Sequence, residues 1–371
     1  MKRFVLTAMA CAFGLGMMAQ KEAQQLADSI VKYQMASGGW PKNQNWLKGV
    51  KPEDAREWAR TGIGSTIDNG ATTTELDALA KAVDQVVQIQ AREYKWLDKN
   101  LLKERYKTYT EAFRRGVDFL LAMQYESGGF PQFYPEKKKE AYASQITFND
   151  NAMVSAMRVL RDVANDAPRY RHMGIGKSTK KKCQAAYERG IRCILLCQIR
   201  VDESGEVVPY GAPSWRDSKP TVWCQQHDKR TFVPVKARAY ELPSFTGYGE
   251  TCGILDLLMD EPDPSAEVME AVRCGVEWLE THAMRNVAVE RFTNEDGEPD
   301  IRLVEKPDAP LLWARYYDLE KAEPMFCDRD GVPRKHLSEI GYERRNGYSW
   351  VGDGPKRVIE RYKRMIQEKN H

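Results

Sequence analysis

Hydrophobic residues recur at helical spacing along most of the chain. One apolar face is formed by Leu76, Leu79, Ala80, Val83 and Val87. Thr72 and Glu75 stand where a capping box would begin that helix, with a hydroxyl and a carboxylate satisfying free backbone donors. The same periodicity predicts further amphipathic helices, so the expected set covers residues 73–91, 151–163, 248–259 and 355–371.

An internal repeat divides the chain into similar blocks. Residues 27–42 (ADSIVKYQMASGGWPK) and 116–131 (GVDFLLAMQYESGGFP) each predict an apolar helix followed by Gly-Gly-aromatic-Pro. Residues 190–199 and 275–279 repeat the helical part. The first three of these helices share a glutamine near the end: Gln34, Gln124 and Gln198. Helix pairs that recur at this length are typical of toroids and solenoids of helical hairpins.

Signals for β strands are few. Short apolar pieces at residues 207–208, 221–223 and 288–289 suffice for no more than a small hairpin. We therefore predict an all-α fold, an irregular (α/α) toroid of helical hairpins with short β segments. Loops that follow the same end of successive helices would gather at one rim of such a ring, and we expect the functional site there.

The N-terminus has the pattern of an export signal. Lys2 and Arg3 precede an apolar run over residues 4–19, which is shorter than the roughly 20 residues that a membrane-spanning helix needs. Lipid attachment at Cys11 fits the pattern less well. We expect residues 1–19 to be removed as a signal peptide and residues 20–371 to form a single domain. The mature protein is then a secreted or periplasmic monomer without a membrane span.

Composition and charge narrow the classes of partner. The 371 residues are 42% hydrophobic and 29% charged, as in ordinary globular proteins. Formal net charge is +3, and loss of the two leader cations leaves +1. Because no basic stripe is interleaved with aromatic residues, a nucleic-acid partner is not expected. Apart from Cys11, seven cysteines remain without a CxxC pair, which indicates buried free thiols and argues against a zinc site.

Two segments place an acid beside an amide just before a predicted helix. Asp68 is followed by Asn69, and Asn149 is followed by Asp150. Carboxylate and amide oxygens are the ligands that Ca²⁺ prefers, and calcium accepts irregular loops. For either pair alone, a helix-capping role of the aspartate is the favoured interpretation. The repetition of the pattern favours one shared polar site.

A third candidate lies in residues 236–244, where Arg238 and Glu241 stand before a loop and the next helix. An arginine there could bind a carboxylate with two parallel hydrogen bonds, or it could form a structural ion pair with Glu241. His227 is the histidine best placed for a chemical role, and a structural role fits it at least as well. Trp313, in a segment rich in arginine and aromatic residues, is expected in the core.

These motifs together resemble the pectate lyases of polysaccharide lyase family ten. The resemblance covers most of residues 25–350, in the expected order. It is carried by GGWPKN at 38–43, TIDNGAT at 66–72, FNDNAM at 148–153, TVWCQQHD at 221–228, ARAYELPS at 237–244 and WARYY at 313–317. The fold that the resemblance implies is also an irregular (α/α) toroid.

The implied activity is calcium-assisted β-elimination of polygalacturonate or oligogalacturonides. Arg238 stands at the position of the family's Brønsted base. Asp68 and Asp150 stand at the acidic positions that bind Ca²⁺ or the substrate, and Asp68 is implied in catalysis as well. An arginine is normally protonated in proteins, so this mechanism demands a special environment and an alkaline optimum. Three more side chains are implied in substrate binding: Lys42, Asn69 and Arg315.

Two other functions fit the residues. A helical-toroid glycoside hydrolase of acidic polysaccharides would use Asp68 and Asp150 as acid and base. Inverting enzymes of that kind hold the carboxyl groups roughly 6.5–9.5 Å apart and need no metal. A non-catalytic acidic-glycan binding protein would bind oligogalacturonate without forming product. Chelator sensitivity and unsaturated products distinguish the lyase from both.

Overall fold

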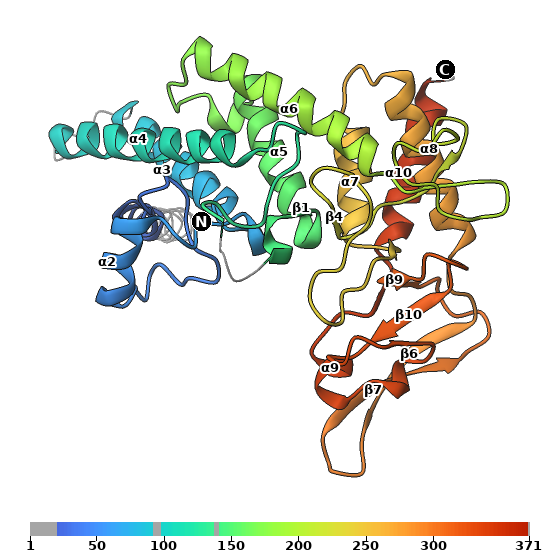
Figure 1. Ribbon diagram of the computed structural model, residues 1–371. Helices are drawn as coiled ribbons and strands as arrows, with labels where there is room; N and C mark the ends of the chain where they lie inside the picture. Colours follow the sequence, from blue (N-terminus) through green and yellow to red (C-terminus); the bar gives the residue numbers. More distant parts are fainter. Residues whose placement is uncertain (1–20, 92–97, 137–140, 370–371) are drawn as a thin grey trace, which may run out of the picture. The chain divides into compact units, whose positions relative to one another are not determined.

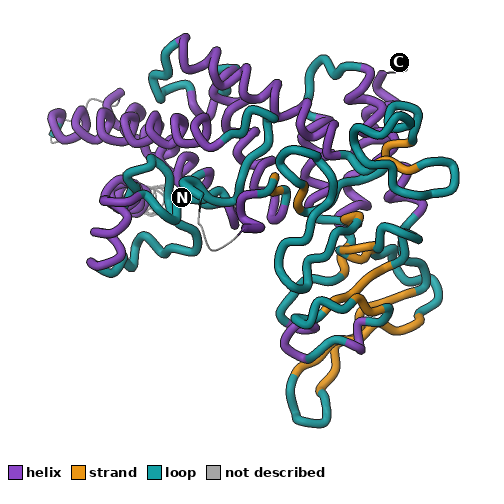
Figure 2. The backbone as a smooth tube through the Cα atoms, in the orientation of Figure 1, coloured by secondary structure: helices purple, strands orange, loops and turns teal. Residues whose placement is uncertain are grey.

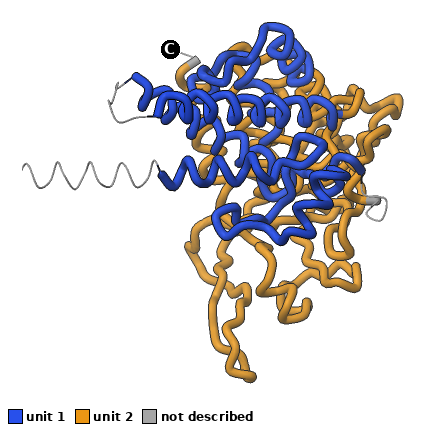
Figure 3. The backbone as a smooth tube through the Cα atoms, turned by 90° about the vertical axis from the view of Figure 1, so that its left-hand side faces the viewer, with its two compact units in different colours: residues 1–124, 132–139, 155–188 blue, residues 125–131, 140–154, 189–371 orange. Residues whose placement is uncertain are grey.

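The computed structural model describes residues 21–91, 98–136 and 141–369 (Figure 1). The predicted signal peptide, residues 1–19, and Cys11 lie outside the described residues. The chain forms two compact units, coloured separately in Figure 3. Residues 1–124, 132–139 and 155–188 belong to the first unit, and residues 125–131, 140–154 and 189–371 to the second. The prediction of a single domain over residues 20–371 stays a prediction.

The first unit is helical. Helices α3 and α4 pack against each other, and each buries one apolar face. The observed α3 has the bounds that periodicity predicts. The helical segments of this unit are residues 21–32, α2 (Pro52–Thr61), η1 (Asp68–Gly70), α3 (Thr73–Ala91), α4 (Lys99–Met123), the part of α5 (Ala152–Ala164) from Ser155 on, η4 (Pro168–Tyr170) and the part of α6 (Lys177–Cys197) up to Glu188.

The second unit combines helices with small sheets, shown as purple and orange segments in Figure 2. Its helices besides the ends of α5 and α6 are η2 (Ala141–Ser144), η3 (Asn149–Asn151), α7 (Glu250–Met259), α8 (Ala266–Thr281), η5 (Leu337–Glu339), α9 (Tyr342–Asn346) and α10 (Gly354–Lys369). Helix α10 packs against α7 and α8 and buries Val358. Its Arg357 and Arg361 pair with Asp256 of α7, so the C-terminal helix is part of the fold.

Twelve short strands pair within the described part of the second unit. Each of four sheets has two strands, and the fifth has the order β11-β10-β9-β5. The longest pair is the hairpin β6–β7, and the others are two to four residues long. The strands are β1 (Ile146–Thr147), β2 (Arg200–Val201), β3 (Lys219–Pro220), β4 (Gln226–His227), β5 (Phe245–Thr246), β6 (Val287–Thr293), β7 (Pro299–Glu305), β8 (Trp313–Ala314), β9 (Tyr316–Tyr317), β10 (Pro324–Cys327), β11 (Pro333–Arg334) and β12 (Val351–Gly352).

The prediction of an all-α toroid is therefore wrong. Helices dominate the first unit, but the second has five small sheets among its described residues, and no closed ring of helical hairpins is defined there. The error has a physical cause. Strands of two residues carry no alternating pattern, because tertiary pairing rather than sequence period defines them. In the hairpin β6–β7, β6 is mostly half-buried and β7 mixes exposed, half-buried and buried positions, so neither sequence alternates cleanly.

The repeated glutamines connect successive helices. Each side-chain amide donates to a backbone carbonyl of a later helix, over 2.8, 2.8 and 3.0 Å: Gln34 to Ala112, Gln124 to Ala186 and Gln198 to Ala271. Three tryptophans make the return connection, because each indole N–H donates to the helix before it. These pairs are Trp40 to Ile30, Trp223 to Ile194 and Trp313 to Leu279. The internal repeat therefore encodes a recurring helix–loop junction.

The glycine pairs of the repeat bring that loop close to the next helix. Gly38 has φ +97°, and a Cβ there would lie 2.5 Å from the Arg115 carbonyl oxygen. Gly128 has φ +92°, and its Cβ would lie 2.1 Å from the Arg189 carbonyl oxygen. This close approach requires a left-handed backbone conformation and the absence of a Cβ, and glycine is the amino acid that provides both.

Two further expectations from the sequence concern the cysteines and membrane-spanning helices. The seven cysteines that the structure describes are buried and unpaired, as the sequence indicates. Among the described residues, no helix combines the length and the apolar character needed to cross a bilayer.

Candidate active site

The acid/amide turn of the second unit lies directly before α5. Asp150 and Asn151 have φ of 51° and 57°, a left-handed conformation that Asp and Asn tolerate better than other side chains. The backbone N–H of Asn149 donates to the Gln225 carbonyl at 3.0 Å, which attaches the turn to the segment preceding β4. This backbone directs the Asp150 carboxylate to the surface, where its side chain is 38% exposed.

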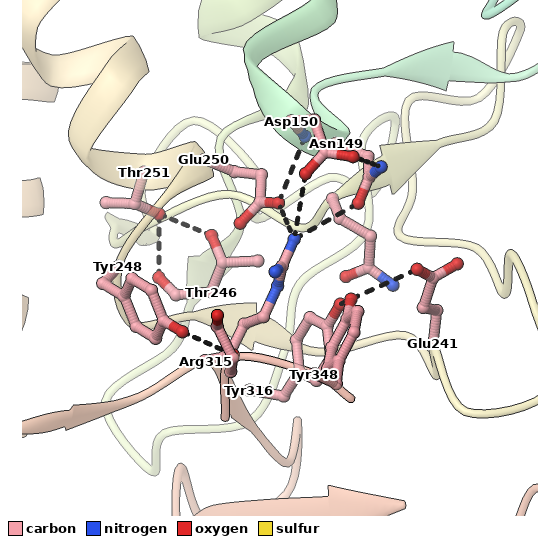
Figure 4. Close-up of polar contacts among 12 residues, drawn as sticks. Asn149, Asp150, Glu241, Thr246, Tyr248, Glu250, Thr251, Arg315, Tyr316 and Tyr348 are labelled. Carbon is pink, nitrogen blue, oxygen red and sulfur yellow. Dashed lines mark hydrogen bonds and ion pairs between the residues drawn. The ribbon is translucent and has the colours of Figure 1, made fainter. Parts of the chain in front are cut away.

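Arg315 lies against this turn with two carboxylates around it (Figure 4). Its Nη2 donates to Oε1 of Glu250 at 2.6 Å and lies 3.7 Å from Oδ1 of Asp150. The amide of Asn149 joins the group, since its Nδ2 donates to Asp150 Oδ2 at 2.8 Å. Glu250 is 1% exposed and Arg315 11% exposed. The cluster therefore presents Asp150 to solvent and keeps its other two charges inside.

Arg315 stays protonated in this environment. Burial by itself lowers the pKa of Arg315, but Glu250 and the surrounding tyrosines together outweigh burial, so the pKa lies well above that of an ordinary arginine. Two carboxylates face one guanidinium, so the local charge of Arg315, Glu250 and Asp150 is negative overall. Such a surplus of carboxylate oxygens favours a cation, or an anionic ligand that binds together with a cation.

Arg238 is held by the carboxylate that the sequence pairs with it. Its Nε donates to Glu241 Oε2 at 2.9 Å, and its backbone N–H donates to the same oxygen at 3.1 Å. The Glu241 side chain is 2% exposed, whereas that of Arg238 is 40% exposed. The ion-pair alternative is thus observed. Among the described residues, the two terminal nitrogens of Arg238 donate no hydrogen bond, so they remain free to contact a substrate.

The acid/amide turn of the first unit carries the other predicted residues. Lys42 forms an ion pair with Oδ2 of Asp68, which is buried. Asn69 donates from Nδ2 to Oδ1 of Asn43 at 3.1 Å and is exposed. The Asp68 backbone N–H donates to the hydroxyl of Thr66 at 3.0 Å, which fixes the turn.

The predicted capping box forms only in part. Glu75 accepts a hydrogen bond from the Thr72 backbone, as expected. The Thr72 hydroxyl, however, donates to the Thr66 carbonyl at 2.8 Å and accepts from the Trp40 N–H at 3.1 Å. It therefore joins the repeat loop to the acidic turn, and it is not available to cap α3.

The oxygens present suit calcium chemically. Oδ1 of Asp68 and Oε2 of Glu250 are buried and accept no hydrogen bond from the described residues. Asp150 adds an exposed carboxylate. Within the described residues no cluster of three or more His, Cys, Asp or Glu side chains is arranged to hold a metal. A hard cation would accordingly need oxygens from a bound acidic ligand as well, since calcium takes six to eight.

His227 has a structural role. It is fully buried, and its Nδ1–H donates to the Phe232 carbonyl at 2.7 Å while its Nε2 accepts from the Cys224 N–H at 3.0 Å. Both ring nitrogens are occupied by backbone groups. Burial lowers the pKa of His227 to about 4, so the ring is neutral at physiological pH.

The predicted site residues fall into two groups. Arg238, Asp150 and Arg315 gather in the second unit, and Lys42, Asp68 and Asn69 gather in the first. Sequence reasoning missed Glu250. It is the first residue of α7, where an acid is common for reasons of the helix dipole, so only its distant partner Arg315 reveals it.

Comparison with known proteins decides the family. The sequence profile of the pectic acid lyases matches residues 34–359. The chain belongs to the pectic acid lyase family. Among curated proteins, none matches the chain.

Solved structures agree with this assignment. A family 10 polysaccharide lyase from Cellvibrio cellulosa is 30% identical, with 93% of this chain and 94% of that chain covered and a TM-score of 0.69. An Asp-to-Ala variant of a family 10 polysaccharide lyase from Cellvibrio cellulosa, in complex with trigalacturonic acid, is also 30% identical, with 92% of each chain covered and a TM-score of 0.69. The resemblance seen in the sequence is confirmed, and the protein is a lyase of the pectate lyase class. This assignment favours the lyase over the hydrolase and the non-catalytic alternatives.

Gly253 in the first turn of α7 provides a test of the Asp150 turn. A Cβ at that position would lie 1.8 Å from Oδ1 of Asn151, so Gly253→Ala must displace the residue after Asp150. We expect a loss of about 1–3 kcal/mol in the free energy of unfolding and weaker substrate binding. Thermal unfolding and oligogalacturonate calorimetry measure both. The control is Gly354→Ala, where the nearest atom lies at 3.8 Å; equal effects from the two substitutions would refute the role of Gly253.

Proposed function

We propose that this pectate lyase cleaves the α-1,4 bonds of polygalacturonate by calcium-assisted β-elimination, with Arg238 as the base. The observation that carries the proposal is the grouping of Arg238, Asp150 and Arg315 in one unit of a chain from the pectic acid lyase family. A chain of contacts joins them, because Glu241 binds both Arg238 and Tyr348, and the Tyr348 ring lies under Arg315.

The reaction removes the proton from C5 of a galacturonate residue, next to the carboxylate. A terminal nitrogen of Arg238, in the neutral guanidine form, takes that proton, the C4–O4 bond breaks, and a C4=C5 double bond forms. The departing oxygen takes a proton from water. The difficulty lies in the negative charge that develops on the carboxylate as the proton leaves, and positive charge nearby lowers that barrier.

In the second unit, Asp150 and the acidic substrate itself would hold calcium, and Asp68 is the proposed oxygen donor of the first unit. Bound there, the ion would withdraw electron density from the uronate carboxylate. The exposed carboxylate of Asp150 supplies two hard oxygens at the surface of the second unit, and its orientation depends on Asn149. Arg315 and Glu250 fix the turn from inside, because the Asp150 N–H and the Arg315 guanidinium share Oε1 of Glu250.

Positive charge also orients the anionic substrate. Lys42 and Arg315 are the proposed carboxylate-binding cations, with Asn69 as a hydrogen-bonding partner. Because Asp68 and Asp150 partly neutralise these two cations, we expect each to contribute less binding than an unpaired cation would. In this proposal the enzyme acts as an exported monomer.

The proposal is tested by incubating purified protein with polygalacturonate and Ca²⁺ at alkaline pH. Unsaturated product is expected to accumulate as rising ultraviolet absorbance, and a chelator is expected to stop it. New reducing ends without ultraviolet absorbance would indicate hydrolysis. Calorimetric binding of oligogalacturonate with neither signal would indicate a binding protein.

A further inference from the structure

Arginine and tyrosine side chains alternate through the interior of the second unit. The guanidinium carbon of Arg315 lies 4.6 Å from the ring centroid of Tyr348. Arg344 lies 5.4 Å from the same ring and 4.5 Å from the ring of Tyr240. Arg238 lies 5.5 Å from Tyr240. Tyr348 is therefore packed between the cation beside Asp150 and a second buried arginine.

The hydroxyl of Tyr348 reaches the carboxylate that holds Arg238. It donates to Oε1 of Glu241 at 3.2 Å and lies 2.6 Å from the hydroxyl of Tyr316 (Figure 4). Oε2 of Glu241 accepts from Arg238 Nε at 2.9 Å. The phenol and the guanidinium thus share one buried carboxylate and compete for its charge.

We propose that Tyr348 is a positioning residue that tunes Arg238 through Glu241. Its hydroxyl withdraws charge from the carboxylate and so weakens the hold of Glu241 on the protonated guanidinium. The inference rests on the proposed role of Arg238 as the base.

The sign of the effect follows from the hydrogen bonds. A carboxylate that loses one donor has more charge for the donor that remains, so removal of the Tyr348 hydroxyl strengthens the pair with Arg238. The neutral fraction of Arg238 then falls at every pH. Burial raises the pKa of Tyr348 well above its ordinary value, so the phenol keeps its proton in an alkaline assay.

Other ionisable groups surround Arg238 and Tyr348, and all of them are the same in the native enzyme and in Tyr348→Phe. Burial opposes protonation of Arg238, but Glu241 together with Tyr240 and Tyr348 outweighs burial, so the net direction of the Arg238 pKa is upward. The ionisable groups that face Arg238 or Tyr348 from the packed elements are Tyr240, Glu241, Glu250, Arg315, Tyr316 and Arg344.

The experiment measures kcat/KM against pH for the full chain at saturating Ca²⁺. Tyr348→Phe is expected to move the rising limb to higher pH by about half a unit, the worth of one hydrogen bond. Glu241→Gln removes the anion and is expected to move the limb to lower pH by about one unit or more. Once Glu241 is neutral, adding Tyr348→Phe is expected to produce little further shift, because the two changes act on one path.

The matched control is Tyr342→Phe, which removes a hydroxyl that donates to the Pro299 carbonyl at 3.0 Å and is expected to leave the profile in place. A uniform fall in rate for Tyr348→Phe without a shift would show a structural role and overturn the inference. If a melting curve shows that Tyr348→Phe is unfolded, Glu241→Gln provides the test instead. The inference is then overturned if the rising limb of the Glu241→Gln pH profile stays at its native position. Arg238→Ala is assayed in parallel. Full activity of that variant would refute the proposed role of Arg238 as the base, whereas it would leave the contacts among Tyr348, Glu241 and Arg238 as described.

Discussion

Replacing Arg238 by alanine is expected to lower kcat/KM for polygalacturonate by about a thousandfold, within the range that removal of a general base produces. The fold should survive. The Arg238 side chain is 40% exposed, and Glu241 keeps hydrogen bonds from the Tyr348 hydroxyl and the backbone N–H of residue 238. Loss of the ion pair is expected to cost about 1 kcal/mol or less of unfolding free energy, because its arginine is partly solvated. Kinetics and thermal unfolding measure the two effects separately.

The control for this variant is a second arginine beside the same tyrosine. Arg329 lies 5.9 Å from the Tyr240 ring, but its side chain is 63% exposed and pairs with Glu343. Arg329→Ala is therefore expected to leave turnover nearly unchanged. If Arg238→Ala is as active as Arg329→Ala, the proton is taken by another group.

A lysine at position 238 separates a base from a fixed positive charge. Lysine has a lower ordinary pKa than arginine, so a base role predicts that residual activity appears at lower pH in Arg238→Lys. A purely electrostatic role predicts no movement of the pH profile. The native enzyme should gain activity as pH rises, because Glu241 keeps the pKa of Arg238 high despite burial and the neutral form grows only in alkaline solution.

Long amphipathic helices were the part of the fold that could be predicted from the sequence. Helix α3 (Thr73–Ala91) begins and ends where its apolar period does, and α5, α7 and α10 lie within two residues of their predicted starts. The sheets could not be predicted, because their pairing joins distant residues. Ile146 pairs with His227, and Trp313 pairs with Gly352, across stretches that carry no strand pattern.

The candidate site shows the same limit. Asp68 and Asp150 could be identified because an acid next to an amide before a helix is a local motif. Glu241 could be paired with Arg238 because the two are three residues apart. Glu250 needs Arg315, 65 residues further along the chain, before it can be recognised. Buried carboxylates that act through a distant arginine have no signature of their own in one sequence.

Replacing Asp150 by asparagine is expected to weaken calcium-dependent binding of oligogalacturonate by about tenfold or more, since calcium affinity follows the charge of its ligands. Asparagine is preferred to alanine because residue 150 has a φ of 51°, which Asn tolerates and Ala does not. The turn should therefore keep its shape while one carboxylate is lost. Calorimetry with and without Ca²⁺ measures the binding, and the ultraviolet assay measures turnover as calcium is titrated.

The control is Asp296→Asn, which removes an exposed carboxylate from the turn between β6 and β7. If Asp150 is a calcium ligand, its variant needs more Ca²⁺ for half-maximal activity, and Asp296→Asn follows the native curve. If Asp150 serves only to orient Arg315, turnover falls but the calcium requirement stays where it was. A third outcome is that a chelator stops the native enzyme but Asp150→Asn keeps native calcium affinity. The metal is then bound by other oxygens. The next side chains to replace would be Asp68 and Glu250, whose buried Oδ1 and Oε2 accept no hydrogen bond from the described residues.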